Sequence, residues 1–227
     1  MSISHFDEIA GEYDEALPAH VVQHYLRKRT RYVLEHCPPG DGLDVGCGTG
    51  VLAQRLTGAG YRMWGVDPSA GMLEVARRRA ADVQASVAPG TALPFDSDRF
   101  DLVLTVAVLH HIAAPDPVRQ TLGEMVRVLR PGGRLIVWDH NPRNPYWRNL
   151  MARVPQDTGE ERLIPEAEVL DGLSAAGARV LRSDQLGFVP DFVPAGAVPA
   201  AARIERGVER VPGLRRLCAH NVVLATK

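Results

Sequence analysis

Cysteine is scarce in this sequence: its 227 residues include only Cys37, Cys47 and Cys218. An odd, widely spaced trio forms neither a disulfide framework nor a zinc-ligand pattern, and it fits a reducing compartment. The first 15 residues carry acidic side chains rather than a basic segment followed by an apolar run, so we expect no signal peptide. No apolar stretch approaches the ~20 residues that cross a bilayer. We therefore expect a cytoplasmic protein with no membrane span.

An excess of positive charge is also missing. Lys and Arg total 26 against 27 Asp and Glu, for a net charge of -1, which leaves no basic footprint for nucleic acid. Arginines do gather near the C-terminus, at Arg203, Arg206, Arg210, Arg215 and Arg216. Because Glu205 and Glu209 are interleaved with them, we interpret this segment as a solvated helix face rather than an anion site.

Short β-rich runs alternate with helical patterns from Asp41 to Asp139, which is typical of βαβ units and a parallel sheet. The predicted strands are Gly42–Gly46, Arg62–Val66, Ala85–Ala88, Phe100–Val106 and Arg134–Trp138, and the helices between them are Val51–Leu56, Met72–Ala81 and Pro117–Leu129. Ser69 is a candidate N-cap, and Pro131-Gly132-Gly133 is predicted to end the last of these helices.

The flanks add a helix at Val21–His36, a helix at Pro165–Ala176, and strands at Arg179–Leu186 and Cys218–Thr226. The proline-rich segment Asp191–Ala200 suits a surface segment or lid. The pattern predicts a Rossmann-like, doubly wound α/β fold: a mostly parallel seven-stranded sheet with an antiparallel last strand and helices on both faces. We expect one domain over residues 1–227, with an N-terminal helical cap (1–36), a cofactor-binding core (41–139), and a substrate loop or lid with the C-terminal strands (140–227).

A glycine loop joins the first strand to the first core helix. Gly46, Gly48 and Gly50 allow a tight turn and a close backbone approach to a ligand. Their G-x-G-x-G spacing differs from the G-x-G-x-x-G of dinucleotide sites. Asp44, inside the preceding strand, is poorly placed beside a pyrophosphate but well placed for a cationic amino group; a strand-end cap is the alternative.

A second acid, Asp67, follows 21 residues after Gly46, at the end of the second strand. A carboxylate there accepts hydrogen bonds from the ribose hydroxyls of an adenosine. The alternative is an acid favoured by the dipole at a helix N-terminus. Together the two acids are more specific than either alone.

Several motifs occur in a characteristic order. They are Asp-Val-Gly-Cys-Gly-Thr-Gly (44–50), Gly-Val-Asp-Pro-Ser (65–69) with Met72-Leu73, Leu-Pro-Phe (93–95), Phe-Asp-Leu-Val (100–103) and Leu-Arg-Pro-Gly-Gly (129–133). This order resembles the class I S-adenosylmethionine (SAM) dependent methyltransferases, above all the small-molecule branch with ubiquinone and menaquinone methylating enzymes (methyltransferase type 11). Residues 6–14 also resemble that branch's opening helix, whose aromatic residue closes over the cofactor.

The resemblance implies S-adenosyl-L-methionine as cofactor and S-adenosyl-L-homocysteine as product. The residues that it places around the cofactor are Tyr13, Asp44, Gly46, Cys47, Gly48, Asp67, Pro68, Met72, Thr91, Ala92, Val106 and Ala107. Pro89 stands where the family often has an acid for the adenine amino group, so backbone groups are the alternative there. Cys47 is expected to pack against the cofactor rather than act as a nucleophile.

Methyl transfer from a sulfonium needs alignment and exclusion of water, and a base only if the acceptor must lose a proton. The catalytic candidates are His111, His140 and Tyr13, and no metal is expected. His110 is interpreted as a turn cap, and His220 as a packed core residue.

The functional hypothesis is methyl transfer to a small-molecule acceptor, a metabolite or natural-product intermediate, by a monomer or homodimer. The alternatives are a lipid-linked or saccharide acceptor and a non-catalytic SAM-binding module. A nicotinamide-dependent oxidoreductase is disfavoured by the glycine spacing and by the lack of a Tyr-x-x-x-Lys motif.

Overall fold

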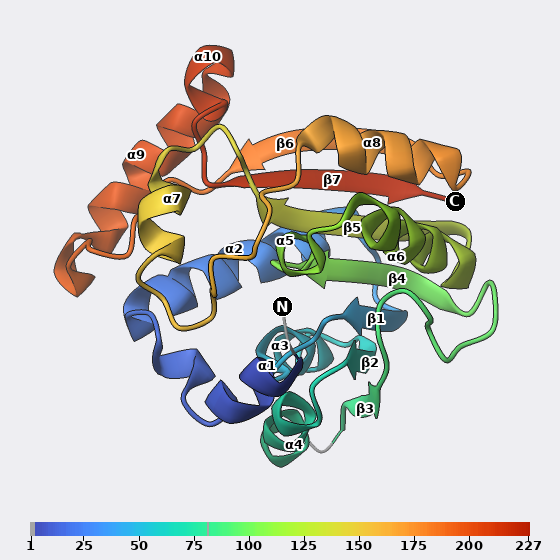
Figure 1. The fold of residues 1–227 in the computed structure, drawn as a ribbon. Helices are drawn as coiled ribbons and strands as arrows, with labels where there is room; N and C mark the ends of the chain where they lie inside the picture. Colours follow the sequence, from blue (N-terminus) through green and yellow to red (C-terminus); the bar gives the residue numbers. More distant parts are fainter. Residues whose placement is uncertain (1–2, 81) are drawn as a thin grey trace.

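The computed structural model describes residues 3–80 and 82–227. Seven strands form one sheet in the order β3-β2-β1-β4-β5-β7-β6 (Figure 1). They are β1 (Asp41–Val45), β2 (Arg62–Asp67), β3 (Gln84–Val87), β4 (Phe100–Val106), β5 (Leu129–His140), β6 (Arg179–Leu186) and β7 (His220–Thr226). Strands β1 to β5 pair in parallel, and β7 lies antiparallel to both β5 and β6. The predicted doubly wound sheet with an antiparallel last strand is therefore confirmed.

Helices cover the two faces and the end of the sheet at which the parallel strands finish. They are α1 (Ile3–Ile9), α2 (Ala19–His36), α3 (Val51–Thr57), α4 (Ala70–Arg79), α5 (Leu109–Ile112), α6 (Pro115–Val128), α7 (Tyr146–Met151), α8 (Glu166–Ala175), α9 (Val198–Arg210) and α10 (Pro212–Arg215), with short 3-10 turns η1 (Tyr13–Glu15) and η2 (Ala195–Ala197). No helix within residues 3–80 and 82–227 combines the length and apolarity that a bilayer crossing needs.

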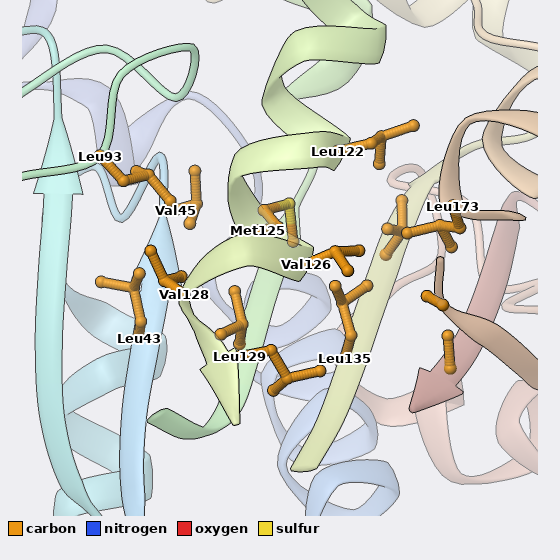
Figure 2. Packing of buried hydrophobic residues seen from close by; sticks show 14 of the residues in the cluster. Leu43, Val45, Leu93, Leu122, Met125, Val126, Val128, Leu129, Leu135 and Leu173 are labelled. Atoms are coloured by element: carbon orange, nitrogen blue, oxygen red, sulfur yellow. The ribbon is translucent and has the colours of Figure 1, made fainter. Parts of the chain in front are cut away.

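Two hydrophobic clusters hold these layers together. On one face, Leu122 and Met125 of α6 pack with Leu173 of α8 against Leu135 of β5 (Figure 2). On the other face, α2 and α3 pack against Leu102, Leu104 and their neighbours in β4 and β5. Burial on both faces explains why the strand at Phe100–Val106 reads as a continuous apolar run.

The boundary between α6 and β5 differs from the prediction. The helix ends at Val128, and Leu129 already has extended backbone angles (φ -73°, ψ 133°) and begins β5. Pro131, Gly132 and Gly133 thus lie inside the strand rather than ending the helix. A proline and two glycines are tolerated inside the strand because the pairing of β4 with β5 shifts register between Phe100 and Leu102, as at a β-bulge.

The C-terminal third contains helices that the sequence pattern missed. The predicted lid segment Asp191–Ala200 runs into α9, since a proline at the start of a helix costs no hydrogen bond. The short helices α7 and α10, and α5 in the middle of the chain, were also not predicted, and the last strand begins at His220 rather than Cys218. These elements surround the carboxyl ends of the parallel strands.

Candidate active site

The glycine loop between β1 and α3 has three left-handed residues. Gly46, Gly48 and Gly50 have φ of +74°, +52° and +75°, a backbone conformation that side chains disfavour. A Cβ on Gly46 would lie 2.4 Å from Cγ2 of Val108, whereas one on Gly48 would meet no atom within 4 Å. On one side the loop therefore packs against Val108, in the segment that follows β4. On the other side, at Gly48, it faces open space.

Asp67 ties this loop to the end of β2. Its carboxylate accepts hydrogen bonds from the backbone N–H of Gly48 and of Ser69, each at 2.9 Å. Ser69 Oγ in turn accepts from Met72 N at 3.1 Å, so the predicted N-cap of α4 is confirmed. Burial raises the pKa of Asp67, and the two amides partly offset that rise. Each carboxylate oxygen retains a lone pair for a further donor.

Asp44 and Arg29 both line the cavity, and neither side chain has a hydrogen-bond partner in the part of the chain that the structure describes. Asp44 is buried in β1, and its side chain bonds to no residue that the structure describes. Burial and the nearby Asp67 raise its pKa to about 7, against an opposing effect of Arg29. Arg29, on α2, has an Nε that is buried and unpaired within residues 3–80 and 82–227. An acceptor for an ammonium thus lies in the same cavity as a donor for a carboxylate.

The N-terminal segment closes over the loop. Asp7 of α1 accepts hydrogen bonds from Ser69 Oγ (2.6 Å) and Gly71 N (2.9 Å) at the start of α4. Asp14 accepts from Thr49 Oγ1 at 2.9 Å and pairs with Arg79. These contacts fix Phe6 and Tyr13 beside the glycine loop, where both line the cavity.

One cavity of about 920 Å³ collects the predicted residues at the carboxyl ends of the parallel strands. Of the predicted cofactor-binding residues, those that line it are Tyr13, Asp44, Gly46, Cys47, Gly48, Asp67, Pro68, Met72, Thr91, Val106 and Ala107. Ala92 is exposed and does not line it, whereas Pro89 and Gly90 do. The volume suits a nucleoside cofactor together with a second molecule.

The surroundings of Ala107 and Cys47 constrain the backbone of the first and the thiol of the second. Ala107, just after β4, has φ of +57°, a strained conformation for a residue with a side chain, and its N–H bonds to Trp138 O at 2.8 Å. Burial raises the pKa of the Cys47 thiol well above its usual value, and its Sγ packs beside Gly65. A protonated, buried thiol is a poor nucleophile, which agrees with a packing role.

A histidine cluster lines the same cavity. His110 Nδ1 lies 2.6 Å from Asp139 Oδ1, and the same carboxylate accepts from the backbone N–H of His140 at 2.7 Å and of His110 at 3.3 Å. Burial opposes charge on His110, but the adjacent Asp139 raises its pKa. With Nδ1 donating to Asp139, the lone pair of His110 is on Nε2. The residue interpreted as a turn cap thus forms a carboxylate-imidazole pair.

The two histidines predicted as catalytic lie beside this pair. Burial and the neighbouring His110 lower the pKa of His111 to about 3, and His111 Nδ1 has no hydrogen-bond partner among the described residues. His140 stacks between His110 (ring centroids 4.0 Å) and Trp147 (3.5 Å), and burial lowers its pKa well below the usual value. Both rings are held neutral, so they can orient an acceptor more readily than they can take its proton.

Nitrogen and oxygen atoms in this cluster also meet the spacing of metal ligands. One atom from each of His110, His111 and Asp157 lies within 4.8 Å of the others, and the same holds for His110, Asp139 and His140. In both sets His110 is shared, and Asp139 is already bonded to three donors.

Beyond the histidines the cavity becomes apolar and aromatic. Trp147 of α7 and His220 of β7 meet edge to face at 5.4 Å, and Tyr25 packs on His220 at 5.2 Å. Phe188 and Phe192 complete this end. Six aromatic residues of the predicted N-terminal cap and C-terminal lid region line the cavity: Phe6, Tyr13, Tyr146, Trp147, Phe188 and Phe192. His220 is buried, as predicted, but it also faces the cavity.

Comparison with known proteins agrees with this geometry. Residues 43–137 match the methyltransferase domain family. A demethylmenaquinone methyltransferase of Renibacterium salmoninarum is 32% identical over 72% of this chain and 74% of its own length. The chain belongs to the class I SAM-dependent methyltransferases. This confirms the resemblance that the ordered motifs carried, and with it SAM as the family's cofactor.

A second relative and a solved structure are also similar to this chain. A demethylmenaquinone methyltransferase of Paenarthrobacter aurescens is 34% identical, and the match spans 63% of this chain but only 60% of that protein. Among solved structures, a SAM-dependent methyltransferase from Thermotoga maritima superposes with a TM-score of 0.73 at 24% identity, over 99% of this chain and 98% of that chain. The last comparison shows a shared fold.

Sequence reasoning missed Arg29 and the pairing of His110 with Asp139. Arg29 sits in a helix rich in arginine and lysine, where no local pattern marks which of them lines the cavity. The pairing joins residues 29 positions apart. Its only signal was that both residues follow neighbouring strands of a parallel sheet, whose carboxyl ends meet.

Proposed function

We propose that this methyltransferase transfers the methyl group of SAM to a small-molecule acceptor, with S-adenosyl-L-homocysteine as the product. The observation that carries the proposal is one cavity that is lined by the glycine loop and Asp67, by His110 of the His110–Asp139 pair, and by a set of aromatic side chains. The names of the menaquinone methyltransferase relatives support a small, ring-bearing acceptor.

The residues present fit SAM in three places. Asp67 would accept from the ribose hydroxyls with the lone pairs that Gly48 and Ser69 leave free. Asp44 and Arg29 would hold the ammonium and carboxylate of the methionine part, because neither side chain has a hydrogen-bond partner among the described residues. Open space over Gly48 admits the close backbone approach. Thr91, Pro68 and Met72 would flank the adenine.

Bound SAM supplies a methyl group that is already activated on a sulfonium. The chain's own residues then orient the acceptor and exclude water, for which α1, η1 and α7 cover the cavity. Where the acceptor must lose a proton, His110 Nε2 would take it, since Asp139 orients the ring and stabilises the imidazolium. His111, His140 and Tyr13 line the same space and would position the acceptor. The division into an N-terminal cap (1–36), a core (41–139) and a C-terminal lid region (140–227) remains a prediction.

A methyl-transfer assay with labelled SAM across an acceptor panel tests this proposal. With an acceptor that must lose a proton, the variants H110A and D139N are expected to lower turnover by about 10²–10⁴-fold and to leave SAM affinity unchanged. The matched control H36Q alters a histidine of α2 that lies outside the cavity. Tight SAM binding with no methylated product from any acceptor would favour a non-catalytic SAM-binding module instead.

A further inference from the structure

The glutamates between the arginines of α9 and α10 pair with α2 and not with those arginines. Glu205 is only 1% exposed, and its carboxylate binds Lys28 Nζ at 2.6 Å and His24 Nε2 at 3.0 Å on α2. Glu209 pairs with the same Lys28 at 2.5 Å. Burial disfavours the charged form, yet His24 and Lys28 hold the pKa of Glu205 at about 2. Both acids therefore anchor α9 to the protein.

The arginines point the other way. Arg203, Arg206, Arg210 and Arg216 are exposed, and their side chains form no ion pair or hydrogen bond with any described residue. Four guanidinium groups within 14 positions thus present uncompensated positive charge to the solvent. The chain as a whole has a net charge of -1, so this charge is local to one surface.

Apolar side chains are exposed on the same segment. Eight large hydrophobic residues are exposed in the part of the chain that the structure describes, and six of them lie between positions 188 and 217. They are Phe188, Phe192, Ile204, Val211, Leu214 and Leu217. We call these six residues and the four arginines the α9–α10 surface.

The α9–α10 surface adjoins the mouth of the cavity. Phe188, Phe192 and Leu217 are exposed and also line the cavity. Figure 1 shows α9 and α10 beyond the end of the sheet at which β6 finishes and β7 begins. A molecule that enters through these residues would pass directly to Trp147 and the histidine cluster.

We propose that the α9–α10 surface docks on a membrane that contains anionic phospholipid, and that the acceptor is a lipophilic molecule that enters the cavity from that membrane. Exposed arginines beside apolar side chains match the lipid interface, where phosphate groups lie next to acyl chains. A two-fold dimer through this surface would bring the unpaired arginines of both copies together, and a nucleic acid would leave Leu214 and Val211 without an apolar partner. The choice of acceptor rests on the proposed function; the docking does not.

Vesicle co-sedimentation tests the docking. The purified protein is mixed with vesicles of phosphatidylcholine alone, or of phosphatidylcholine with phosphatidylglycerol, at low and high salt. We expect binding only to the anionic vesicles, and weaker binding at high salt. The triple variant R203Q/R206Q/R210Q is expected to bind roughly a hundredfold more weakly, about fivefold for each arginine.

Two further variants make the test specific. The control R78Q/R119Q/R179Q removes the same charge from α4, α6 and the start of β6, and it should bind vesicles as the unaltered protein does. The variant I204S/L214S keeps all arginines and should lose roughly tenfold in vesicle affinity. Calorimetry with SAM checks that each variant is folded.

The outcomes separate the two proposals. A protein that binds SAM but no anionic vesicle overturns the docking alone, as does a control variant that loses as much affinity as the arginine variant. A concentration-dependent dimer that I204S/L214S abolishes would assign the surface to self-association and also overturn it. If SAM does not bind, the proposed function fails, whereas vesicle binding still reports on the surface.

Discussion

Asp44→Asn should stabilise the protein in the absence of SAM and weaken its affinity for SAM. Asp44 is 3% exposed and has no partner among the described residues, so its charge is costly when the cavity holds no cation. Asparagine has the same shape and cannot ionise. The substitution therefore separates the cost of the charge from the packing of the side chain.

The magnitude and its sign follow from the pKa of Asp44, which rises from 3.8 to about 7 in the folded protein. Below pH 3.8 the carboxyl is protonated in both states. Between pH 3.8 and 7 only the unfolded state releases the proton, so the free energy of unfolding of the unaltered protein falls as the pH rises. At about 1.4 kcal/mol per pKa unit, the loss reaches about 4 kcal/mol above pH 7.

Thermal unfolding of both proteins between pH 4 and pH 8 measures this difference. The melting temperature of the variant should exceed that of the unaltered protein by about 8–16 °C at pH 8, at about 2–4 °C per kcal/mol, and by little at pH 4. Calorimetry should show SAM affinity reduced by about 1.5–3 kcal/mol, the contribution of a hydrogen bond to a charged group. A difference that does not change with pH would refute the reasoning.

Three other perturbations test separate parts of the site. R29M should raise the Kd for SAM by about 10- to 100-fold in calorimetry, because the methionine carboxylate loses its charged partner; R31M, exposed on the same helix, should not, and equal effects would remove Arg29 from the site. G46A should lower stability by about 2–4 kcal/mol in thermal unfolding, since overlap of its Cβ with Val108 adds to the backbone strain at φ +74°, whereas G48A should cost only about 1 kcal/mol of backbone strain; similar losses would contradict the assigned environments. Treatment with EDTA should leave turnover unchanged, because His110 and Asp139 are already bonded to each other; a loss that a divalent cation restores would assign a metal to the histidine cluster.

The central part of the fold was predictable because its signals are local. The run Phe100–Val106 matches β4 residue for residue, and Ser69 caps α4 as its position before the helix indicates. Apolar periodicity and capping interactions involve residues a few positions apart, so they can be recognised in a single sequence. The C-terminal helices α9 and α10 were not predicted because their stability depends on contacts across the fold. Glu205, for example, binds Lys28, which lies 177 positions away.

The site divides in the same way. Asp44, Asp67 and the loop glycines were found because they lie next to strand ends in a recognisable order. The orientation of paired side chains could not be predicted from the sequence. His110 and His111 are neighbours in sequence, yet of the two only His110 bonds to Asp139. The partners of Glu205 and Glu209 in the C-terminal segment were not predictable for a related reason. Composition counts Glu205 and Glu209 beside the arginines, but the helix turns acids and arginines to different sides.

Calorimetry with SAM on the unaltered protein and on D67A tests the central claim most directly, namely that one cavity at the carboxyl ends of the parallel strands binds SAM through Asp67. We predict one binding site in the unaltered protein and an affinity lower by about 1–3 kcal/mol in D67A, whose ribose partner is gone. No heat with SAM or S-adenosyl-L-homocysteine, or equal affinity in the two proteins, would contradict the account.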